Sequence, residues 1–333
     1  MKYEDISPKA LIVDQVTAMN ADIAMLNSRK SEFIAVPCPA CGTKTSTPVY
    51  EKYGMKHVFC AACETQYISP RPPPSVLRDF YTGSKNYEYW ATHIFPATAE
   101  TRREKIFKPR ARRVADLCKE HGCETNLLVE IGAGYGFFCE ELKKLSLFKK
   151  VIAIEPTPHL AQICRDKGIE VVEQVVEDVK FDQQADVVAN FEVIEHLFDP
   201  EAFLRATLKL LRPGGFLILT CPNIAGFETQ TLKQYSDTID HEHLNYFSPA
   251  SLGQLARRVG FEVVTSHTPG VLDVDIVHER FTDQSKEPIH LDPFIARIVG
   301  SSNESVRENF QGFLTQNGLS SNMMLICRRP LTA

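Results

Sequence analysis

The sequence has no long hydrophobic run, no internal repeat and no low-complexity tract. Its longest apolar stretches have the length of a β-strand, whereas a helix that spans a bilayer needs about 20 apolar residues. The first residues, Met-Lys-Tyr-Glu-Asp, also lack the charged and then apolar pattern of a secretion signal. From these absences we expect a cytoplasmic protein with no membrane partner.

An excess of positive charge is missing as well. The 333 residues carry 37 Lys and Arg against 42 Asp and Glu, which gives a net charge of −5. Because proteins that bind nucleic acid usually carry a basic surface, we expect no nucleic-acid partner. The composition, 44% hydrophobic and 24% charged, is that of a globular protein with one large domain or two modest ones.

Four of the ten cysteines form two CxxC pairs. Cys38 and Cys41 are separated by 18 residues from Cys60 and Cys63. Each pair can present two thiolates to one ion, and two pairs complete a tetrahedral site made only of sulfur. We therefore predict a zinc ribbon whose Zn²⁺ is structural, since four protein ligands leave no open position for chemistry. The other six cysteines are scattered and are expected to be buried as small hydrophobic residues.

The pattern of the sequence divides the chain into five parts. We expect a helical arm at 1–35, the zinc ribbon at 36–75, a helical connector and lid at 76–124, a core at 125–268 and 322–333, and an insertion of irregular pattern at 269–321. The arm carries apolar residues spaced like one helix face, which either dock on the protein itself or form a partner surface. Within the connector, we expect Pro109 to kink or split the helix.

Apolar runs of strand length alternate with helix signals throughout the core. Strands are expected at 126–131, 151–154, 170–172, 186–189, 216–220, 261–264 and 323–327. The runs lack clear polar alternation, which is typical of strands buried on both faces. The sequence therefore predicts an α/β fold with a doubly wound, Rossmann-like parallel sheet that helices cover on both sides.

A glycine-rich loop, Glu130-Ile-Gly132-Ala-Gly134-Tyr-Gly136, directly follows the first of these strands and opens a helix. Glycines there allow a tight turn and let the backbone approach a ligand closely. Glu155 ends the second strand, where an acidic side chain can accept hydrogen bonds from ribose hydroxyls. The third glycine comes two residues after the second instead of three, so the loop differs from the dinucleotide-binding fingerprint.

This combination resembles motif I of class I S-adenosylmethionine-dependent methyltransferases. The resemblance covers 125–268 and the final strand, and it includes the stretches 190–197 and 211–215. It implies that Glu130 suits the cationic amino group of the cofactor's methionine moiety, where a pyrophosphate would be repelled. The implied cofactor residues are Glu130, Gly132 and Gly134 along the cofactor, Glu155 at the ribose, Val176 and Glu177 near the adenine, and Asn190 and Phe191 at the methionine and ribose side.

A group of titratable residues, Asp240-His241-Glu242-His243, follows the fifth strand. Ligands bind at this edge of such sheets, so the group offers candidate general bases. The stretch resembles sugar C-methyltransferases that act on nucleotide-linked deoxy-keto-sugars and that also carry a cysteine-ligated zinc module. The resemblance implies that Glu242 and His243 form the catalytic pair, with Asp240 standing where a tyrosine often occurs. His241 is expected to cap or pack.

Residues Glu195-His196 lie near the methyl donor in the same fold and make His196 a second candidate base, although helix capping explains them equally well. We expect an enzyme that transfers a methyl group from S-adenosylmethionine to a hydroxyl or activated carbon of a sugar, sugar nucleotide or other small metabolite. One alternative is an RNA methyltransferase that uses the ribbon and the basic segment 102–113. Another is a non-catalytic protein of this fold that binds a partner. Residues 269–321 either close over the site or pair with another subunit, so a homo-oligomer is one of the alternatives.

Overall fold

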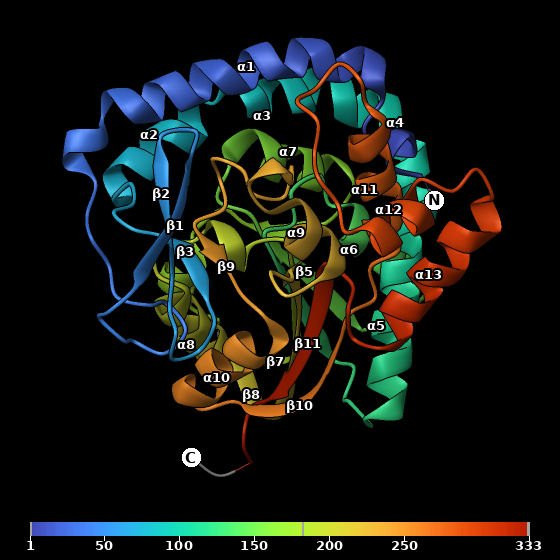
Figure 1. Cartoon of the computed structure of the whole chain (residues 1–333). Coiled ribbons are helices and arrows are strands. Elements are labelled where there is room, and N and C mark those ends of the chain that lie inside the picture. Colours follow the sequence, from blue (N-terminus) through green and yellow to red (C-terminus); the bar gives the residue numbers. More distant parts are fainter. Residues whose placement is uncertain (1, 182, 332–333) are drawn as a thin grey trace.

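A seven-stranded sheet forms the centre of the computed structural model, which describes residues 2–181 and 183–331 (Figure 1). Its strand order is β10-β11-β8-β7-β4-β5-β6. The strands are β4 (Leu127–Ile131), β5 (Lys150–Ile154), β6 (Glu170–Val172), β7 (Ala185–Phe191), β8 (Leu211–Pro222), β10 (Glu262–His267) and β11 (Asn322–Arg328). The predicted strands are therefore present, and β8 begins five residues before its predicted start at residue 216.

The prediction of a parallel sheet is wrong for one strand. From β6 to β8 all neighbours are parallel, but β11 is antiparallel to both β8 and β10. The helices between β10 and β11 lie at the carboxyl edge of the sheet, so the chain enters β11 from that edge and must run the other way. The sheet remains parallel-dominated and matches the expected doubly wound class.

Helices cover both faces of the sheet, as predicted. On one face α5 (Lys108–Glu120), α6 (Phe137–Lys144) and α7 (Pro158–Asp166) pack, and on the other α8 (Pro200–Leu210) and α10 (Pro249–Val259). Within β4, Leu128 joins the first of these cores and Val129 the second, because successive side chains of a strand point to opposite faces. Helices α7, α8 and α10 each begin at a proline, whose fixed φ suits the first position of a helix.

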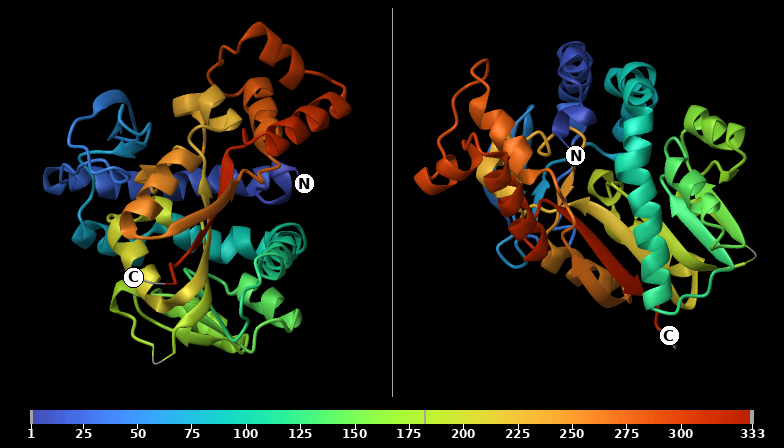
Figure 2. Two further views of the ribbon diagram at one scale, coloured as in Figure 1. Left: turned by 90° about the horizontal axis from the view of Figure 1, so that it is seen from below. Right: turned by 90° about the vertical axis from the view of Figure 1, so that its right-hand side faces the viewer.

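The N-terminal third contains a ribbon and a run of helices. The ribbon strands are β1 (Thr47–Lys52), β2 (Met55–Phe59) and β3 (Gln66–Ile68), and a fourth strand, β9 (Asn245–Tyr246), comes from the core. The helices are α1 (Lys9–Ser28), α2 (Pro74–Gly83), α3 (Lys85–Tyr89) and α4 (Phe95–Arg102). Helix α1 extends from the ribbon towards α11 on the other side of the molecule (Figures 1 and 2).

The connector remains helical through Pro109 instead of splitting there. A π-helical turn, Arg103–Phe107, directly precedes α5, and Pro109 lies in the first turn of α5. A wider turn at this point relieves the clash between a proline ring and the carbonyl of the preceding turn. A second π-helical turn spans Trp90–Ile94.

The insertion is helical, which the sequence did not indicate. It forms α11 (Asp273–Thr282), α12 (Pro293–Val299) and α13 (Glu304–Gln316), which pack on α9 (Phe227–Leu232) through a small apolar core. Because each helix is short and polar stretches separate them, no long periodic pattern marks them. The remaining short elements are 3-10 turns at Tyr3–Asp5, Lys30–Glu32, Val176–Asp178, Ile194–His196 and Lys233–Tyr235. No helix in residues 2–181 and 183–331 is both long and apolar enough to cross a membrane.

A buried arginine joins the ribbon to the core. Arg71 is 1% exposed and donates to the side-chain oxygen of Asn245 at 2.9 Å and to the carbonyls of Ile68 and Phe198 at 3.0 and 3.2 Å. The amide of Asn245 in turn donates to the carbonyl of Leu197 at 2.7 Å. A charge in such a place is stable only while its hydrogen bonds are made.

Replacing this arginine tests how strongly the ribbon and the core are joined. We expect Arg71→Met to lower the free energy of unfolding by about 3 kcal/mol, because it leaves several buried acceptors without donors. Chemical denaturation measures the loss. The matched variant Arg328→Met removes a half-exposed ion pair with Glu262, and we expect it to change the stability by no more than about 0.5 kcal/mol. Equal effects of the two variants would contradict this account.

Candidate active site

The glycine loop after β4 follows a path that a side chain would obstruct. Gly132 has a φ of +74°, and a Cβ added there would lie 2.6 Å from a methyl group of Val193. Gly134 has a φ of +54°, and a Cβ there would meet no atom within 4 Å. The first glycine therefore allows close packing on the loop after β7, while the second leaves the loop open on its outer side.

Glu155 connects the end of β5 to this loop. It is 5% exposed, and its two carboxylate oxygens accept from the backbone N–H of Gly134 at 2.8 Å and of Thr157 at 2.9 Å. Burial raises the pKa of the Glu155 carboxyl. Each oxygen keeps a lone pair for a further donor, so the carboxylate can still accept from a ligand hydroxyl.

Two more buried polar groups lie at the ends of neighbouring strands. Asn190 lies near the end of β7 and is fully buried. Neither polar atom of its side-chain amide has a hydrogen-bond partner among the residues that the structure describes. Glu130, in β4, accepts from the thiol of Cys139 at 2.9 Å, and burial raises its pKa to about 8. An unpaired buried amide is costly in a folded protein, and a bound ligand that hydrogen-bonds to it would remove this cost. A polar ligand with a cationic group, such as S-adenosylmethionine, fits this set of residues.

The other predicted cofactor residues lie around the same edge of the sheet. Phe191 follows Asn190 and packs its ring on the guanidinium of Arg110, 4.4 Å from the ring centroid. Val176 is buried in a 3-10 turn after β6, and Glu177 next to it is exposed. Because β7, β4 and β5 are adjacent and parallel, their carboxyl ends bring the glycine loop, Glu155 and Asn190 together.

The segment 237–247, which we call the histidine segment, is shaped by Asp240. Its Oδ1 accepts from the backbone N–H of Glu242 at 2.8 Å and of His243 at 2.7 Å. A short carboxylate suits such a turn, which gives Asp240 a structural role. The strand β9 at the end of the segment then pairs with β3 of the ribbon.

His243 is held in one tautomer. Its Nδ1 lies 2.8 Å from the carbonyl oxygen of Thr238, and because a carbonyl only accepts, Nδ1 carries the proton. The Nε2 atom of the neutral ring therefore keeps its lone pair and can accept a proton. The His196 ring packs edge to face against His243, with 4.6 Å between the ring centroids, and burial lowers its pKa to about 3. His196 is thus a neutral neighbour of the candidate base.

Glu242 points away from His243, although the two are adjacent in sequence. Its Oε1 accepts from the amide of Asn86 at 2.9 Å and lies 3.6 Å from Nε2 of His241. Burial raises the pKa of Glu242. The buried ring of His241 packs edge to face on Phe80, 5.8 Å between centroids. The predicted Glu242–His243 pair therefore consists of two side chains with separate surroundings.

Sequence reasoning missed the residues that hold Glu242. Asn86, in α3, accepts from Gln15 of α1 at 2.7 Å through its side-chain oxygen. The carboxylate of Asp22, also in α1, accepts from the backbone N–H of Lys85 and Asn86 at 2.8 and 3.0 Å. The N-terminal helix thus contributes to the surroundings of the histidine segment. No local motif signals this, because the contacts join residues up to 156 positions apart.

The four predicted metal ligands gather in the ribbon. The sulfur atoms of Cys38, Cys41, Cys60 and Cys63 all lie within 4.8 Å of one another. Two equivalent turns present them, since the N–H of Gly42 bonds to the carbonyl of Cys38 and that of Glu64 to the carbonyl of Cys60, each at 2.8 Å. Such a compact set of four sulfurs suits a tetrahedral Zn²⁺ and leaves no position for a substrate.

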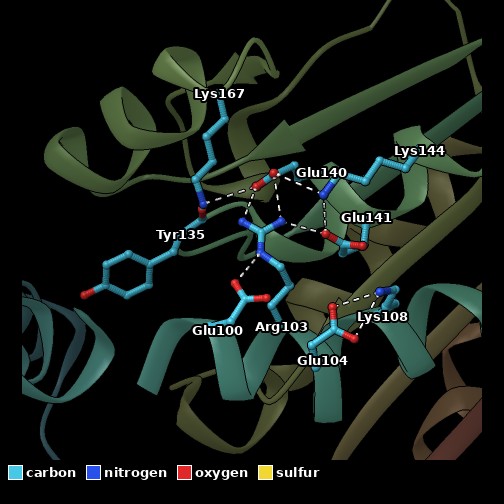
Figure 3. A network of polar contacts seen from close by, with 9 residues as sticks. All are labelled: Glu100, Arg103, Glu104, Lys108, Tyr135, Glu140, Glu141, Lys144 and Lys167. Atoms are coloured by element: carbon cyan, nitrogen blue, oxygen red, sulfur yellow. Dashed lines mark hydrogen bonds and ion pairs between the residues drawn. The ribbon is translucent and has the colours of Figure 1, made fainter. Parts of the chain in front are cut away.

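The basic segment 102–113 faces carboxylates of the chain itself (Figure 3). Nη1 of Arg103 lies 2.8 Å from Oε1 of Glu140 and 2.6 Å from Oε1 of Glu141. Further pairs join Lys105 to Asp5 and Lys108 to Glu104. Arg103 thus joins the connector to α6, while the two lysines pair with the N-terminal turn and with the connector itself. These pairs favour a structural role for the three residues over the RNA-binding alternative.

Several known proteins are similar to this chain. The sequence matches a family described as methyltransferase domain over residues 98–266. It is 30% identical over 174 residues to the C-methyltransferase NovU of Streptomyces niveus, which covers 50% of this chain and 40% of that protein. It is 28% identical over 151 residues to a ubiquinone biosynthesis O-methyltransferase of Xanthomonas euvesicatoria, covering 41% of this chain and 62% of that protein.

One similar solved structure is that of an S-adenosylmethionine-dependent methyltransferase from Thermotoga maritima, described as a possible histamine N-methyltransferase. Its sequence is 20% identical to this chain. It covers 76% of this chain and 98% of that chain, with a TM-score of 0.47. The sequence matches cover less than two thirds of the length of the two relatives named above, NovU and the O-methyltransferase.

The cysteine site predicts a dependence on metal. We expect about one Zn²⁺ per chain by elemental analysis, and we expect Cys60→Ser to lose the ion and the ribbon's structure, because three ligands hold zinc far less tightly than four. The variant Cys123→Ser changes a cysteine outside the cluster and is expected to retain the ion. Zinc-free wild-type protein with an intact ribbon would contradict the prediction.

Proposed function

Because this chain belongs to the methyltransferase-domain family, we propose that it is an enzyme that transfers a methyl group from S-adenosylmethionine to a small-molecule acceptor. The observation that carries the proposal is the carboxyl edge of β4, β5 and β7. There the open face of Gly134, the carboxylate of Glu155 and the unpaired amide of Asn190 come together. Methyl transfer needs mainly the positioning of donor and acceptor and the removal of one proton.

We assign the cofactor contacts to the residues at this edge. Glu155 would accept from the ribose hydroxyls, the amide of Asn190 would meet the polar groups of the methionine and ribose side, and Glu130 would face the amino group. When bound, S-adenosylmethionine supplies a methyl group activated by its sulfonium charge. A bound cation near Glu130 would favour its ionised form, which burial alone disfavours.

His243 is the base in this proposal. Its Nε2 receives the proton of the acceptor, because Nδ1–H is held by the carbonyl of Thr238. The carboxylate of Asp240, whose Oδ2 lies 3.6 Å from Nδ1, stabilises the imidazolium that forms. Glu242 and His196 remain the other candidate proton acceptors. Burial raises the pKa of Glu242, but its carboxylate faces Asn86 and His241 and not the ring of His243.

For the acceptor we propose a sugar, a sugar nucleotide or another small metabolite with a hydroxyl or an activated carbon. The support is the resemblance of the histidine segment, together with the zinc ribbon, to sugar C-methyltransferases. The ribbon lies next to the segment through β3 and β9, so both features belong to one region of the molecule. We also propose that the ribbon is structural and that the five parts of the chain keep the bounds given above.

Cofactor binding tests the assignment of Glu155. We expect Glu155→Gln to weaken the binding of S-adenosylhomocysteine by about 10- to 100-fold, the cost of losing hydrogen bonds to a charged acceptor. Calorimetric titration measures the change. Glu173→Gln, which removes an exposed partner of Arg165 nearby, serves as the control and is expected to bind as the wild type does. The same affinity in all three proteins would argue against the proposed ribose contact.

A second variant tests the base. We expect His243→Ala to lower the rate of methyl transfer at least about 100-fold while its affinity for S-adenosylhomocysteine stays within about twofold, and added imidazole to restore part of the rate. Transfer of labelled methyl groups to a panel of sugar nucleotides provides the assay. His278→Ala is the control, because its Nδ1 also faces a backbone carbonyl, that of Val299 at 2.6 Å, but outside the site. Full activity of the His243 variant would exclude it as the base.

A further inference from the structure

A small cavity lies beside the histidine segment. Its volume is about 170 Å³, and it is lined by Tyr3, Glu228, Asp237, Thr238 and Ile276. These residues come from the N-terminal 3-10 turn, α9, the histidine segment and α11. The cavity is thus formed where four parts of the chain meet, and two of its five residues belong to the segment that carries the proposed base.

Glu228 lines this cavity and has a buried carboxyl group. The side chain is 1% exposed, and Oε2 accepts from the hydroxyl of Thr238 at 3.3 Å. No hydrogen-bond partner for Oε1 exists in the part of the chain that the structure describes. Burial, together with the nearby carboxylates of Asp273 and Asp237, raises the pKa of Glu228 to about 7. A buried carboxyl with one empty acceptor is costly unless a ligand donor completes it.

Two acidic residues line the cavity. Asp237 also lines it, and burial together with this carboxylate raises the pKa of the Tyr3 phenol to about 12. Lys52 is within electrostatic reach of both Asp237 and Glu228, but its ammonium donates to the carbonyl of Ser236 at 2.8 Å. Lys286 also lies within electrostatic reach of Lys52. The cavity therefore offers a ligand cation two carboxyl groups, the buried Glu228 and the exposed Asp237.

The shape and lining favour an organic cation over a metal ion. A volume of about 170 Å³ is several times the share of one water molecule, and much smaller than a pocket for a whole drug-sized ligand. The wall includes the aromatic ring of Tyr3 and the aliphatic chain of Ile276, which suit carbon atoms next to a positive charge. Hard metal ions require instead that several oxygen atoms converge on a point.

We propose that this cavity is a subsite for an ammonium group of the methyl acceptor, held by Glu228 and Asp237, so that the acceptor is an amine-bearing metabolite. The inference rests on the proposed function, because it concerns the acceptor of that same reaction. Thr238 connects the two sites: its hydroxyl donates to Glu228, and its carbonyl fixes the ring of His243. An amine bound here anchors one end of the acceptor beside the histidine segment.

Two sugars that differ by one amine test the proposal. Full-length protein, with and without saturating S-adenosylhomocysteine, is titrated at pH 7 with D-glucosamine and with D-glucose by calorimetry or NMR. We expect glucosamine to bind at least about 10-fold more tightly, which an added ion pair in a partly buried site can supply. Glu228→Gln should reduce this preference below about threefold. Glu308→Gln, on the exposed side of α13, should keep the preference of the wild type.

Equal binding of the two sugars, binding of neither, or a preference that survives Glu228→Gln would overturn the proposal. Binding of S-adenosylhomocysteine by Glu228→Gln shows that the variant is folded, and Asp237→Asn replaces it if it is not. If wild-type protein binds the cofactor product but does not prefer glucosamine, only the amine subsite is wrong. If it prefers glucosamine but does not bind the cofactor product, the proposed function fails and the subsite stands.

Discussion

The pairing of β3 with β9 is the contact on which the arrangement of the site depends. It sets Tyr67 of the ribbon opposite Asn245 of the histidine segment, and the N–H of Ile68 bonds to the carbonyl of Leu244 at 3.0 Å. Two strands of three and two residues are weak alone, so Arg71 and Asn245 supply the buried hydrogen bonds that fix them. The ribbon thus acts as a support for the histidine segment, so the predicted zinc site and the proposed base belong to one region of the molecule.

The proposed donor and acceptor sites are built in different ways. The donor site uses three adjacent parallel strands, whose buried side chains hold the glycine loop, Glu155 and Asn190 in place. The acceptor side is assembled from distant parts: the ribbon, α1 and α3, the histidine segment and the insertion. Three carboxylates occur there: Glu228 is buried, Glu242 is partly buried and Asp237 is exposed. Such a surrounding favours a ligand that brings positive charge, and it leaves the choice of acceptor to segments outside the sheet.

Local patterns in the sequence predicted what local chemistry determines. The CxxC spacing predicted the cysteine cluster, and the strand, glycine loop and acidic residue predicted the sheet and its edge. The antiparallel β11 and the helices of the insertion were missed, because short elements and their direction depend on tertiary contacts. Arg71, Asn86 and Asn245 were missed for the same reason, since their partners lie as much as 174 positions away. The roles of the cofactor and base residues, and the bounds of the five parts, stay predictions.

Hydrogen exchange of the backbone amides, compared between zinc-bound and zinc-depleted protein, tests most directly whether the ribbon supports the histidine segment. If the β3–β9 pairing carries this support, removal of zinc increases exchange in β3 and throughout the histidine segment, Tyr246 included. The amides of β4 and β7, which pair within the large sheet, keep their protection. Unchanged protection of the histidine segment in zinc-depleted protein whose ribbon has lost its structure would contradict the account.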